Sequence, residues 1–182
     1  GLILNIETAT DVCSVALARD ERVVVLREVQ SGQSHARMLT TLIFDCMKTA
    51  GLQINELDAV AVSKGPGSFT GLRIGAAVAK GICYAIDKPL ISVNTLQSMA
   101  SNYLMNHVIA PGTWLCPMID ARRMEVYTAF FNEHLEFERP TSASIIEEGI
   151  FEEILRLHPV VFFGDGMGKV RHIFEKQGNV KF

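Results

Sequence analysis

Short apolar runs separated by polar turns dominate the first thirty residues and predict β-strands. Three runs have the length and apolar character of strands, at residues 2–6, 12–18 and 22–29. The second run reads as the hairpin partner of the first. A polar turn at residues 30–34 then leads away from these strands.

The next segment has the periodicity of an amphipathic helix, from about His35 to Ala50, and Gly51 ends it. At ~100° per residue its apolar positions cover about half of the circumference. These positions are Met38, Leu39, Leu42, Ile43, Cys46, Met47 and Ala50. Phe44 lies off this stripe, toward the polar side, so the helix has one wide apolar face.

A second helix, from about Gly71 to Ile86, is apolar on almost every side. It follows a short strand at residues 59–63 and the turn Gly65-Pro66-Gly67, and its only charged residues are Arg73 and Lys80. The elements expected next are a strand at residues 90–93 and a helix from an N-cap at Thr95 to about Tyr103.

The second half repeats the order of a hairpin followed by helices. Its expected elements are strands at residues 114–120, 124–131 and 160–163, a turn at 121–123, and a helix from the Gly-Asp-Gly at 164–166 to about residue 176. Residues 133–144 are polar and read as irregular, and residues 178–182 close no element. The repeated order predicts a duplicated α/β architecture, although no sequence repeat is detectable.

Composition narrows the class of protein. Hydrophobic residues make up 48% of the chain and charged residues 20%, which is typical of a globular core and not of a disordered chain. The net charge of −3 provides no global positive field for nucleic acid. The four cysteines are widely spaced within apolar runs, which favours reduced, structural thiols and a cytoplasmic protein. No apolar run approaches membrane-spanning length, so we expect no membrane association.

The glycine-rich junction before the second helix resembles a phosphate loop but does not match one. A P-loop requires a lysine after its last glycine, whereas Gly71 is followed by Leu72 and Arg73. The spacing G-x-G-x-x-x-G also departs from the dinucleotide fingerprint. We therefore expect at most weak anion binding at this turn.

Small residues recur every four positions along the second helix, on two lines. The lines are Gly71-Gly75-Ala79 and Ala77-Gly81-Ala85. A glycine inside a helix costs about 1 kcal/mol relative to alanine, and close approach of another backbone would offset that cost. The segment from Lys64 to Ile86 therefore reads as a packing and partner surface; burial of the whole helix inside its own domain remains the alternative.

Several motifs resemble those of one family. The specific stretch from Lys64 to Gly75 (KGPGSFTGLRIG), with residues 34–37 (SHAR), 93–96 (VNTL), 119–122 (IDAR) and 164–166 (GDG), is similar to the TsaB family, also called YeaZ. The resemblance covers nearly the whole chain. Its motif turn consists of Gly65, Pro66, Gly67, Ser68, Thr70 and Gly71.

The resemblance implies an actin/Hsp70-like ATPase (ASKHA) fold with two lobes, at residues 1–104 and 105–182, each a mixed β-sheet with flanking helices. It implies an accessory, non-catalytic role in making N6-threonylcarbamoyladenosine (t6A) at position 37 of tRNA. The implied partners are TsaD, the catalytic paralogue, and TsaE, an ATPase; tRNA is reached only through the complex. Family members extend past the point where this sequence stops, so we expect a further C-terminal segment.

The two hairpins that hold phosphates in ASKHA ATPases are degenerate here. The first, Asn5 to Thr10, keeps an acid and hydroxyls but has no glycine, and the second, Ile119 to Arg123, has neither glycine nor hydroxyl. The His-x-x-x-His pair of TsaD-like proteins is replaced by Thr95 and Met99. We therefore expect no catalytic residue, no metal and no cofactor of the chain's own, with nucleotide bound only weakly or at a shared interface.

Some polar residues keep an alternative open. Glu7, Thr8, Asp120 and Arg122 are candidate contacts at an inter-lobe cleft. Ser68, His35 and Asp120 imitate a protease triad, but no G-x-S-x-G elbow is present, and a hydrogen bond at the helix start is the preferred role of His35. An active ASKHA kinase or ATPase, a glycoprotease-type peptidase and a homodimeric binding module remain rival hypotheses.

The favoured hypothesis places the helices 35–50 and 71–86 against the equivalent helices of TsaD. The same apolar surface predicts a homodimer when the chain is alone. The predicted partner contacts are Met38, Leu42, Ile43, Cys46, Arg73, Ile74, Ala77, Val78 and Gly81. Periodicity does not separate the residues that face the partner from those that face the chain's own sheet.

Overall fold

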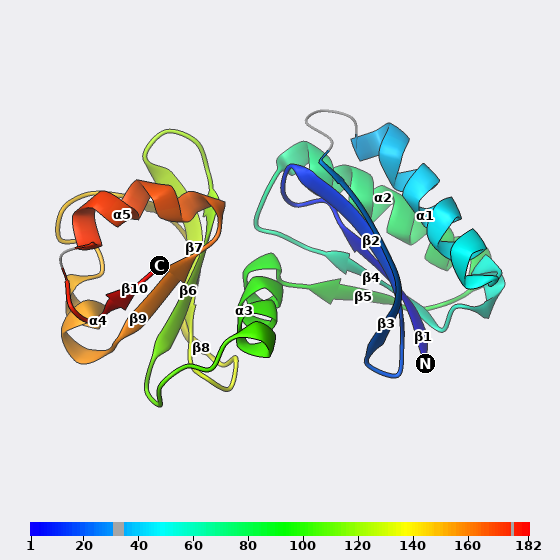
Figure 1. Cartoon of the computed structure of the whole chain (residues 1–182). Coiled ribbons are helices and arrows are strands. Elements are labelled where there is room, and N and C mark those ends of the chain that lie inside the picture. Colours follow the sequence, from blue (N-terminus) through cyan, green and yellow to red (C-terminus); the bar gives the residue numbers. More distant parts are fainter. Residues whose placement is uncertain (31–34, 176) are drawn as a thin grey trace. The chain divides into compact units, whose positions relative to one another are not determined.

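A computed structural model describes residues 1–30, 35–175 and 177–182 of the chain (Figure 1). The turn predicted at residues 30–34 lies almost entirely outside the described residues, as does the side chain of His35, so its predicted hydrogen bond stays a prediction. The chain divides into two compact units, Gly1–Asn94 and Thr95–Phe182.

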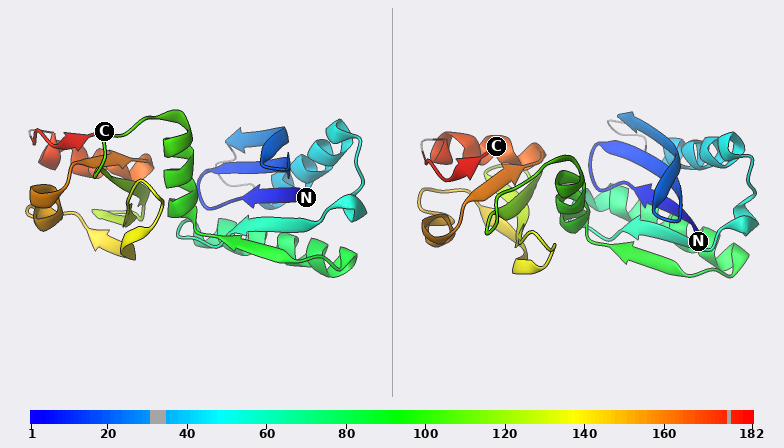
Figure 2. Two further views of the ribbon diagram at one scale, coloured as in Figure 1. Left: turned by 90° about the horizontal axis from the view of Figure 1, so that it is seen from below. Right: turned by 60° about the horizontal axis from the view of Figure 1, so that its bottom comes forward.

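The first unit contains a five-stranded mixed sheet in the order β3-β2-β1-β4-β5. Its strands are β1 (Leu2–Glu7), β2 (Val12–Arg19), β3 (Arg22–Gln30), β4 (Ala59–Ser63) and β5 (Leu90–Val93). The first three strands are antiparallel neighbours, whereas β4 and β5 continue the sheet in parallel with β1. The strands β3 and β5 therefore form the two edges of this sheet (Figure 2).

Two helices cover one face of this sheet. Helix α1 (His35–Ala50) packs on β2 and β3, while α2 (Phe69–Ile86) packs mainly on β4 and also contacts α1 (Figure 1). The alternate residues Leu2, Leu4 and Ile6 of β1 point toward the helices and join the core with Leu39 and Cys46 of α1. A short 3-10 helix (Ile54–Glu56) precedes β4.

The second unit repeats this strand arrangement. Its sheet has the order β10-β9-β6-β7-β8, with strands β6 (Trp114–Asp120), β7 (Glu125–Phe131), β8 (Phe137–Ile145), β9 (Val160–Phe163) and β10 (Val180–Lys181). Here too, three antiparallel strands are followed by two strands parallel to the first. The matching connectivity of the two sheets confirms the predicted duplication.

Helices cover both faces of the second sheet. Helix α3 (Thr95–Asn106) packs on β6 and β7, where Leu96 and Ala100 enter one core cluster. Helices α4 (Glu152–Leu157) and α5 (Gly168–Phe174) bury Ile154 and Phe174 in the cluster on the other face. A 3-10 turn (Asp165–Met167) leads into α5.

The prediction was wrong for three elements of the second unit. Residues 133–144, predicted to be irregular, contain most of β8; α4 was not predicted; and residues 178–182 contain β10, which pairs with β9. The compact units also divide at residue 94 and not at residue 104, because α3 packs on β6 and β7 of the second unit. These elements are short or exposed, and their sequences carry weak periodicity.

Helix α2 corrects the prediction that no apolar run approaches membrane-spanning length. Helix α2 has 18 residues and is long and apolar enough, by length and composition, to cross a membrane. It nevertheless packs on β4 through a buried line that consists of Gly71, Gly75, Ala79 and Cys83. Because Arg73 and Lys80 interrupt its apolar surface, we interpret α2 as a sheet-packed helix with an exposed apolar face.

Candidate functional site

The turn Gly65-Pro66-Gly67 joins β4 to α2 and lies against the loop between β1 and β2. Gly65 and Gly67 have φ angles of 101° and 151°, values that favour glycine. The next residue, Ser68, donates its backbone N–H to the Ala9 carbonyl at 2.6 Å. The Ser68 hydroxyl accepts the Gly71 N–H at 3.3 Å and so caps α2. The N–H groups of Ser68 and Gly71, which would have to bind an anion at this turn, therefore already have hydrogen-bond acceptors within the chain.

The inward line of small residues packs directly on the β1–β2 loop. A Cβ atom added at Gly67, Gly71 or Gly75 would lie less than 3.0 Å from atoms of Thr8 or Ala9, closer than real Cβ atoms come. Thr8 and Ala9 are accordingly almost fully buried. The line Gly71-Gly75-Ala79 therefore allows close approach within the chain and is not available to a partner.

The opposite side of α2 is exposed and carries small and aromatic residues together with Arg73. Phe69 is 75% exposed and Tyr84 is 93% exposed, although both are large hydrophobic residues. The Arg73 guanidinium lies over the Phe69 ring at 5.3 Å from its centroid. Ala77 and Gly81 lie between these residues and are also exposed, and a Cβ at Gly81 would meet nothing within 4 Å. We call Phe69, Arg73, Ala77, Gly81 and Tyr84 the outer face of α2.

The predicted partner contacts separate into three groups. Leu42, Ile43 and Cys46 belong to the core of the first unit, so the prediction was wrong for these three residues. Their apolar stripe faces the chain's own sheet. Met38, Ile74 and Val78 are half-buried, and Ile74 and Val78 pack against that core. Arg73, Ala77 and Gly81 are exposed on the outer face of α2.

In the first hairpin, Glu7 has structural partners. One carboxylate oxygen accepts the Ala9 N–H at 2.6 Å, and the other accepts a short hydrogen bond from the Ser63 hydroxyl. The carboxylate therefore holds the β1–β2 loop against the end of β4. Thr8, the other cleft candidate in this unit, is fully buried against Gly75.

In the second hairpin, Asp120 is held by neighbouring groups. Its carboxylate accepts the Lys169 ammonium at 2.8 Å and the Arg122 backbone N–H at 2.6 Å. The hydrogen bond from Lys169, followed by that from Arg122, lowers the pKa of Asp120 below its ordinary value. The Arg122 side chain is exposed on a residue with φ of 73°. Asp120 thus shapes the hairpin and is not an unengaged base.

The described members of the imitated protease triad likewise have structural roles. Ser68 caps α2, while Asp120 belongs to the other compact unit and pairs with Lys169. Thr70, the remaining polar residue of the motif turn, is exposed in the first turn of α2.

Three exposed aromatic residues of the first unit were missed or left without a role. They are Phe69 and Tyr84 on α2 and Phe44 on α1, which is 65% exposed. A signal was present, because Phe69, Arg73, Ala77 and Gly81 recur every four residues and thus lie on one side of a helix. The prediction concentrated on small residues and began the helix two positions late, at Gly71 and not at Phe69.

Comparisons with known proteins identify relatives along most of the chain. Residues 28–163 match the family model described as "TsaD: tRNA N6-adenosine threonylcarbamoyltransferase". The chain is 38% identical to the tRNA threonylcarbamoyladenosine biosynthesis protein TsaB of Escherichia coli, over 70% of this chain and 53% of that protein. It is 31% identical to the TsaB protein of Buchnera aphidicola from Acyrthosiphon pisum, over 84% of this chain and 68% of that protein.

Solved structures agree in fold. A Pseudomonas aeruginosa protein described as similar to peptidase YEAZ superposes with a TM-score of 0.80 at 25% identity, over 100% of this chain and 83% of that one. A Bacteroides thetaiotaomicron protein with an actin-like ATPase fold superposes with a TM-score of 0.51 at 8% identity, over 99% and 90% of the two chains. The actin-like ATPase fold predicted from the sequence is therefore confirmed. The matched part of this chain spans about half the length of the first TsaB relatives.

Proposed function

We propose a function on the premise that this chain belongs to the TsaB (YeaZ) family of tRNA threonylcarbamoyladenosine biosynthesis proteins. The proposed role is that of an accessory, non-catalytic subunit in t6A synthesis. It would dimerise with TsaD, with TsaE as a further partner. The catalytic step would belong to TsaD, which is the protein that the matched family model describes as a transferase.

The outer face of α2 is the observation that carries this proposal. Phe69 and Tyr84 expose large aromatic side chains on one side of one helix, with Ala77 between them, and exposed apolar patches of this kind mark interaction surfaces. Between them, Ala77 and Gly81 leave the helix backbone accessible to close approach. A second helix can therefore pack tightly on α2, with the aromatic residues at either end of the contact.

The two hairpins support a non-catalytic role. The β1–β2 loop packs on the inward glycines of α2, and Glu7 is engaged by Ala9 and Ser63. Asp120 is engaged by Lys169 in the second hairpin. A nucleotide would have to displace these contacts in either unit. We therefore propose that the chain has no cofactor of its own and that any nucleotide lies at an interface of the assembled complex.

The remaining parts of the proposal follow from the same surface and from composition. Alone, the chain would pair with a second copy through the outer face of α2. Since its net charge is −3, it would contact tRNA only through the complex. We place it in the cytoplasm and, because α2 packs on its sheet, off the membrane.

The test is to mix the chain with TsaD of the same organism and to measure complex formation by size exclusion with light scattering. Gly81→Leu and Tyr84→Ala should each weaken association at least tenfold, about 1.4 kcal/mol. The leucine would occupy the space that a partner helix requires, and the alanine would remove an aromatic anchor.

Gly168→Leu is the matched control, because Gly168 is also an exposed helical glycine with open space around it. It should assemble like the unmodified chain. Circular dichroism should show that all three variants remain folded. Normal assembly of both α2 variants would refute the proposed interface, and failure of the unmodified chain to bind TsaD would refute the proposed function.

A further inference from the structure

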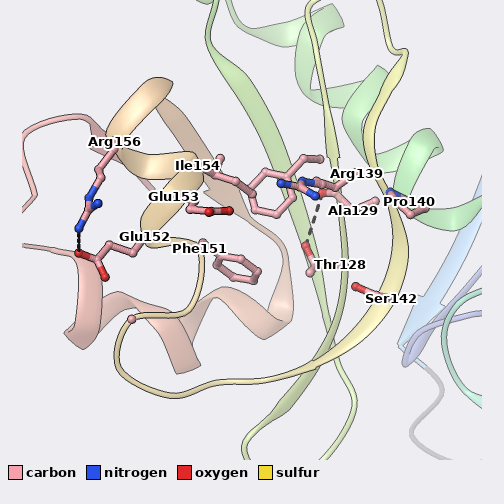
Figure 3. Close-up of a pocket in the computed structure, with 12 residues that line it drawn as sticks. Thr128, Ala129, Arg139, Pro140, Ser142, Phe151, Glu152, Glu153, Ile154 and Arg156 are labelled. Carbon is pink, nitrogen blue, oxygen red and sulfur yellow. Dashed lines mark hydrogen bonds and ion pairs between the residues drawn. The ribbon is translucent and has the colours of Figure 1, made fainter.

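A hollow between β8 and α4 is a separate feature of the second unit, and the proposed role does not use it. It has a volume of about 510 Å³, within the range of small-molecule sites (Figure 3). Its buried lining comes from β7 and from the start of α4, namely Thr128, Ala129, Phe130 and Ile154, with half-buried Phe151 beside them. The Thr128 hydroxyl already donates to the Pro117 carbonyl, so this lining offers mainly apolar contact.

The hollow exists because β8 departs from regular pairing there. Thr128 pairs with Ser142 and Phe130 with Arg139, so β8 has one residue more than β7 between these pairs. Pro140 lies within this irregular stretch and has no N–H to give to the ladder. On the other side, Phe151 has a φ of 64° where the chain turns into α4. Both walls are thus fixed by backbone structure.

The charged residues at the rim are not all neutralised. Arg156 and Glu152 form an ion pair at 2.7 Å. The side chains of Arg139 and Glu153, in contrast, have no ion-pair or hydrogen-bond partner among the described residues. Figure 3 shows Arg139 extending from the β8 wall and Glu153 from the α4 wall toward the hollow, with the Phe151 ring beside it. One free positive and one free negative group therefore border an apolar hollow.

We propose that this hollow binds a small zwitterion with an apolar body, of the class of an apolar α-amino acid or dipeptide. The ligand carboxylate would pair with the Arg139 guanidinium, and its ammonium group with the Glu153 carboxylate. Its apolar side chain would lie against Phe130 and Phe151. This inference is independent of the proposed partnership with TsaD.

Other ligand classes match the hollow less well. A phosphate or another simple anion would meet Arg139 but would be repelled by Glu153, and it would leave the apolar lining uncovered. A simple cation would pair with Glu153 but would be repelled by Arg139, and it too would leave the apolar lining uncovered. A hydrocarbon would cover the phenyl rings but would leave both rim charges without a counter-charge. Only a molecule with both charges and an apolar body satisfies the whole lining.

Trp114 provides the readout, because it is the only tryptophan and its ring lies 6.1 Å from that of Phe130, centroid to centroid. L-Phenylalanine, titrated while fluorescence is excited at 295 nm, should give a saturable change with a dissociation constant in the millimolar range, about what its size allows. Phenylalaninamide lacks the carboxylate and 3-phenylpropanoate lacks the ammonium, so each should bind at least tenfold more weakly. Glycine lacks the apolar body and should give no saturable change.

Matched variants assign the two charges. Arg139→Gln should weaken the binding of phenylalanine at least tenfold but should not weaken the binding of phenylalaninamide. Glu153→Gln should weaken the binding of phenylalanine but should not weaken the binding of 3-phenylpropanoate. Arg171→Gln is the control, because Arg171 lies on α5 and does not line the hollow, and it should bind phenylalanine normally. Amide chemical shifts of residues 128–130, 139–142 and 151–154 should move with the titration. No saturable change, equal loss in all three variants, or shifts located elsewhere would each overturn the proposal.

Discussion

Gly71 and Gly81 lie in the same helix but face different surroundings, and this contrast can be measured. A methyl group at Gly71 would be forced against the Thr8 carbonyl, whereas one at Gly81 would meet only open space. Gly71→Ala should therefore destabilise the chain by about 1–3 kcal/mol through overpacking. Gly81→Ala should stabilise it by up to about 1 kcal/mol, because alanine is the better helix former. Urea unfolding of the two variants would measure both changes.

Stability changes of the same sign in Gly71→Ala and Gly81→Ala would contradict this assignment of the two faces of α2. If both substitutions destabilise to a similar extent, Gly81 is packed in the free chain. If neither does, the contact between α2 and the β1–β2 loop is looser than described. Gly75→Ala provides a further check, since its methyl group would meet the Thr8 side chain and should also destabilise.

The Asp120–Lys169 pair predicts a specific pH dependence. Because the pKa of Asp120 is lowered in the folded chain, the pair contributes stability above the ordinary aspartate range, and that contribution is lost as the pH falls through the lowered value. Lys169→Met should raise the pKa of Asp120 toward its ordinary value, because the largest cause of the lowering is removed. The loss of stability at pH 7 should be at most about 1 kcal/mol, because the Asp120 carboxylate is 46% exposed.

Carboxyl chemical shifts recorded across an acid titration would measure the pKa of Asp120 in both chains. Lys169 also donates to the Glu125 carbonyl at 2.8 Å, so the variant could loosen the hairpin. Arg171→Met, on the same short helix, is therefore the appropriate control, and it should leave the pKa of Asp120 unchanged. An unchanged pKa in Lys169→Met would show that the pair does not form in solution.

At the scale of elements, the sequence predicted the strands and the helix whose apolar residues form the core of the first unit. The strands β1, β2 and β4 and the helix α1 carry buried apolar residues at regular spacing, so their bounds were found within about two residues. Strand β8 was missed because nearly all of it is exposed, and its position at the sheet edge tolerates Pro140. No hydrophobic pattern marks such a strand.

The candidate site was predictable only as a segment. Because α2 is apolar on almost every side, its periodicity does not separate the inward line of Gly71 and Gly75 from the outer face with Gly81. The β1–β2 loop decides which side is inward, and that contact joins residues about sixty positions apart in the chain. The packing of the β1–β2 loop on α2 therefore determines which residues of α2 remain available to a partner. The sequence of neither segment shows this packing by itself.

At the scale of the whole molecule, each compact unit has its own core. One cluster serves the first unit and two serve the second, and α3 contributes Leu96 and Ala100 to one of the latter. We therefore expect residues 1–94 and residues 95–182 each to fold as separate chains. Amide spectra of the two fragments should be well dispersed and should resemble the corresponding parts of the full-chain spectrum.

A fragment that begins at residue 105 tests the position of the boundary. It lacks nearly all of α3, including Leu96 and Ala100, and so exposes the cluster around Leu115 and Phe131. It should unfold at a lower urea concentration than residues 95–182, or remain unfolded. Equal stability of the two fragments would favour the boundary at residue 104.

The packing of three glycines on Thr8 and Ala9 also restricts how this chain can evolve. A mutation that enlarges a residue on α2's inward line is tolerated only if the β1–β2 loop recedes, and a larger residue at position 8 or 9 requires a matching change on the helix. The loop and the inward line should therefore covary among descendants. Substitutions on the outer face of α2 are not restricted by the β1–β2 loop. Their rate should instead follow the surface of the partner that covers this face.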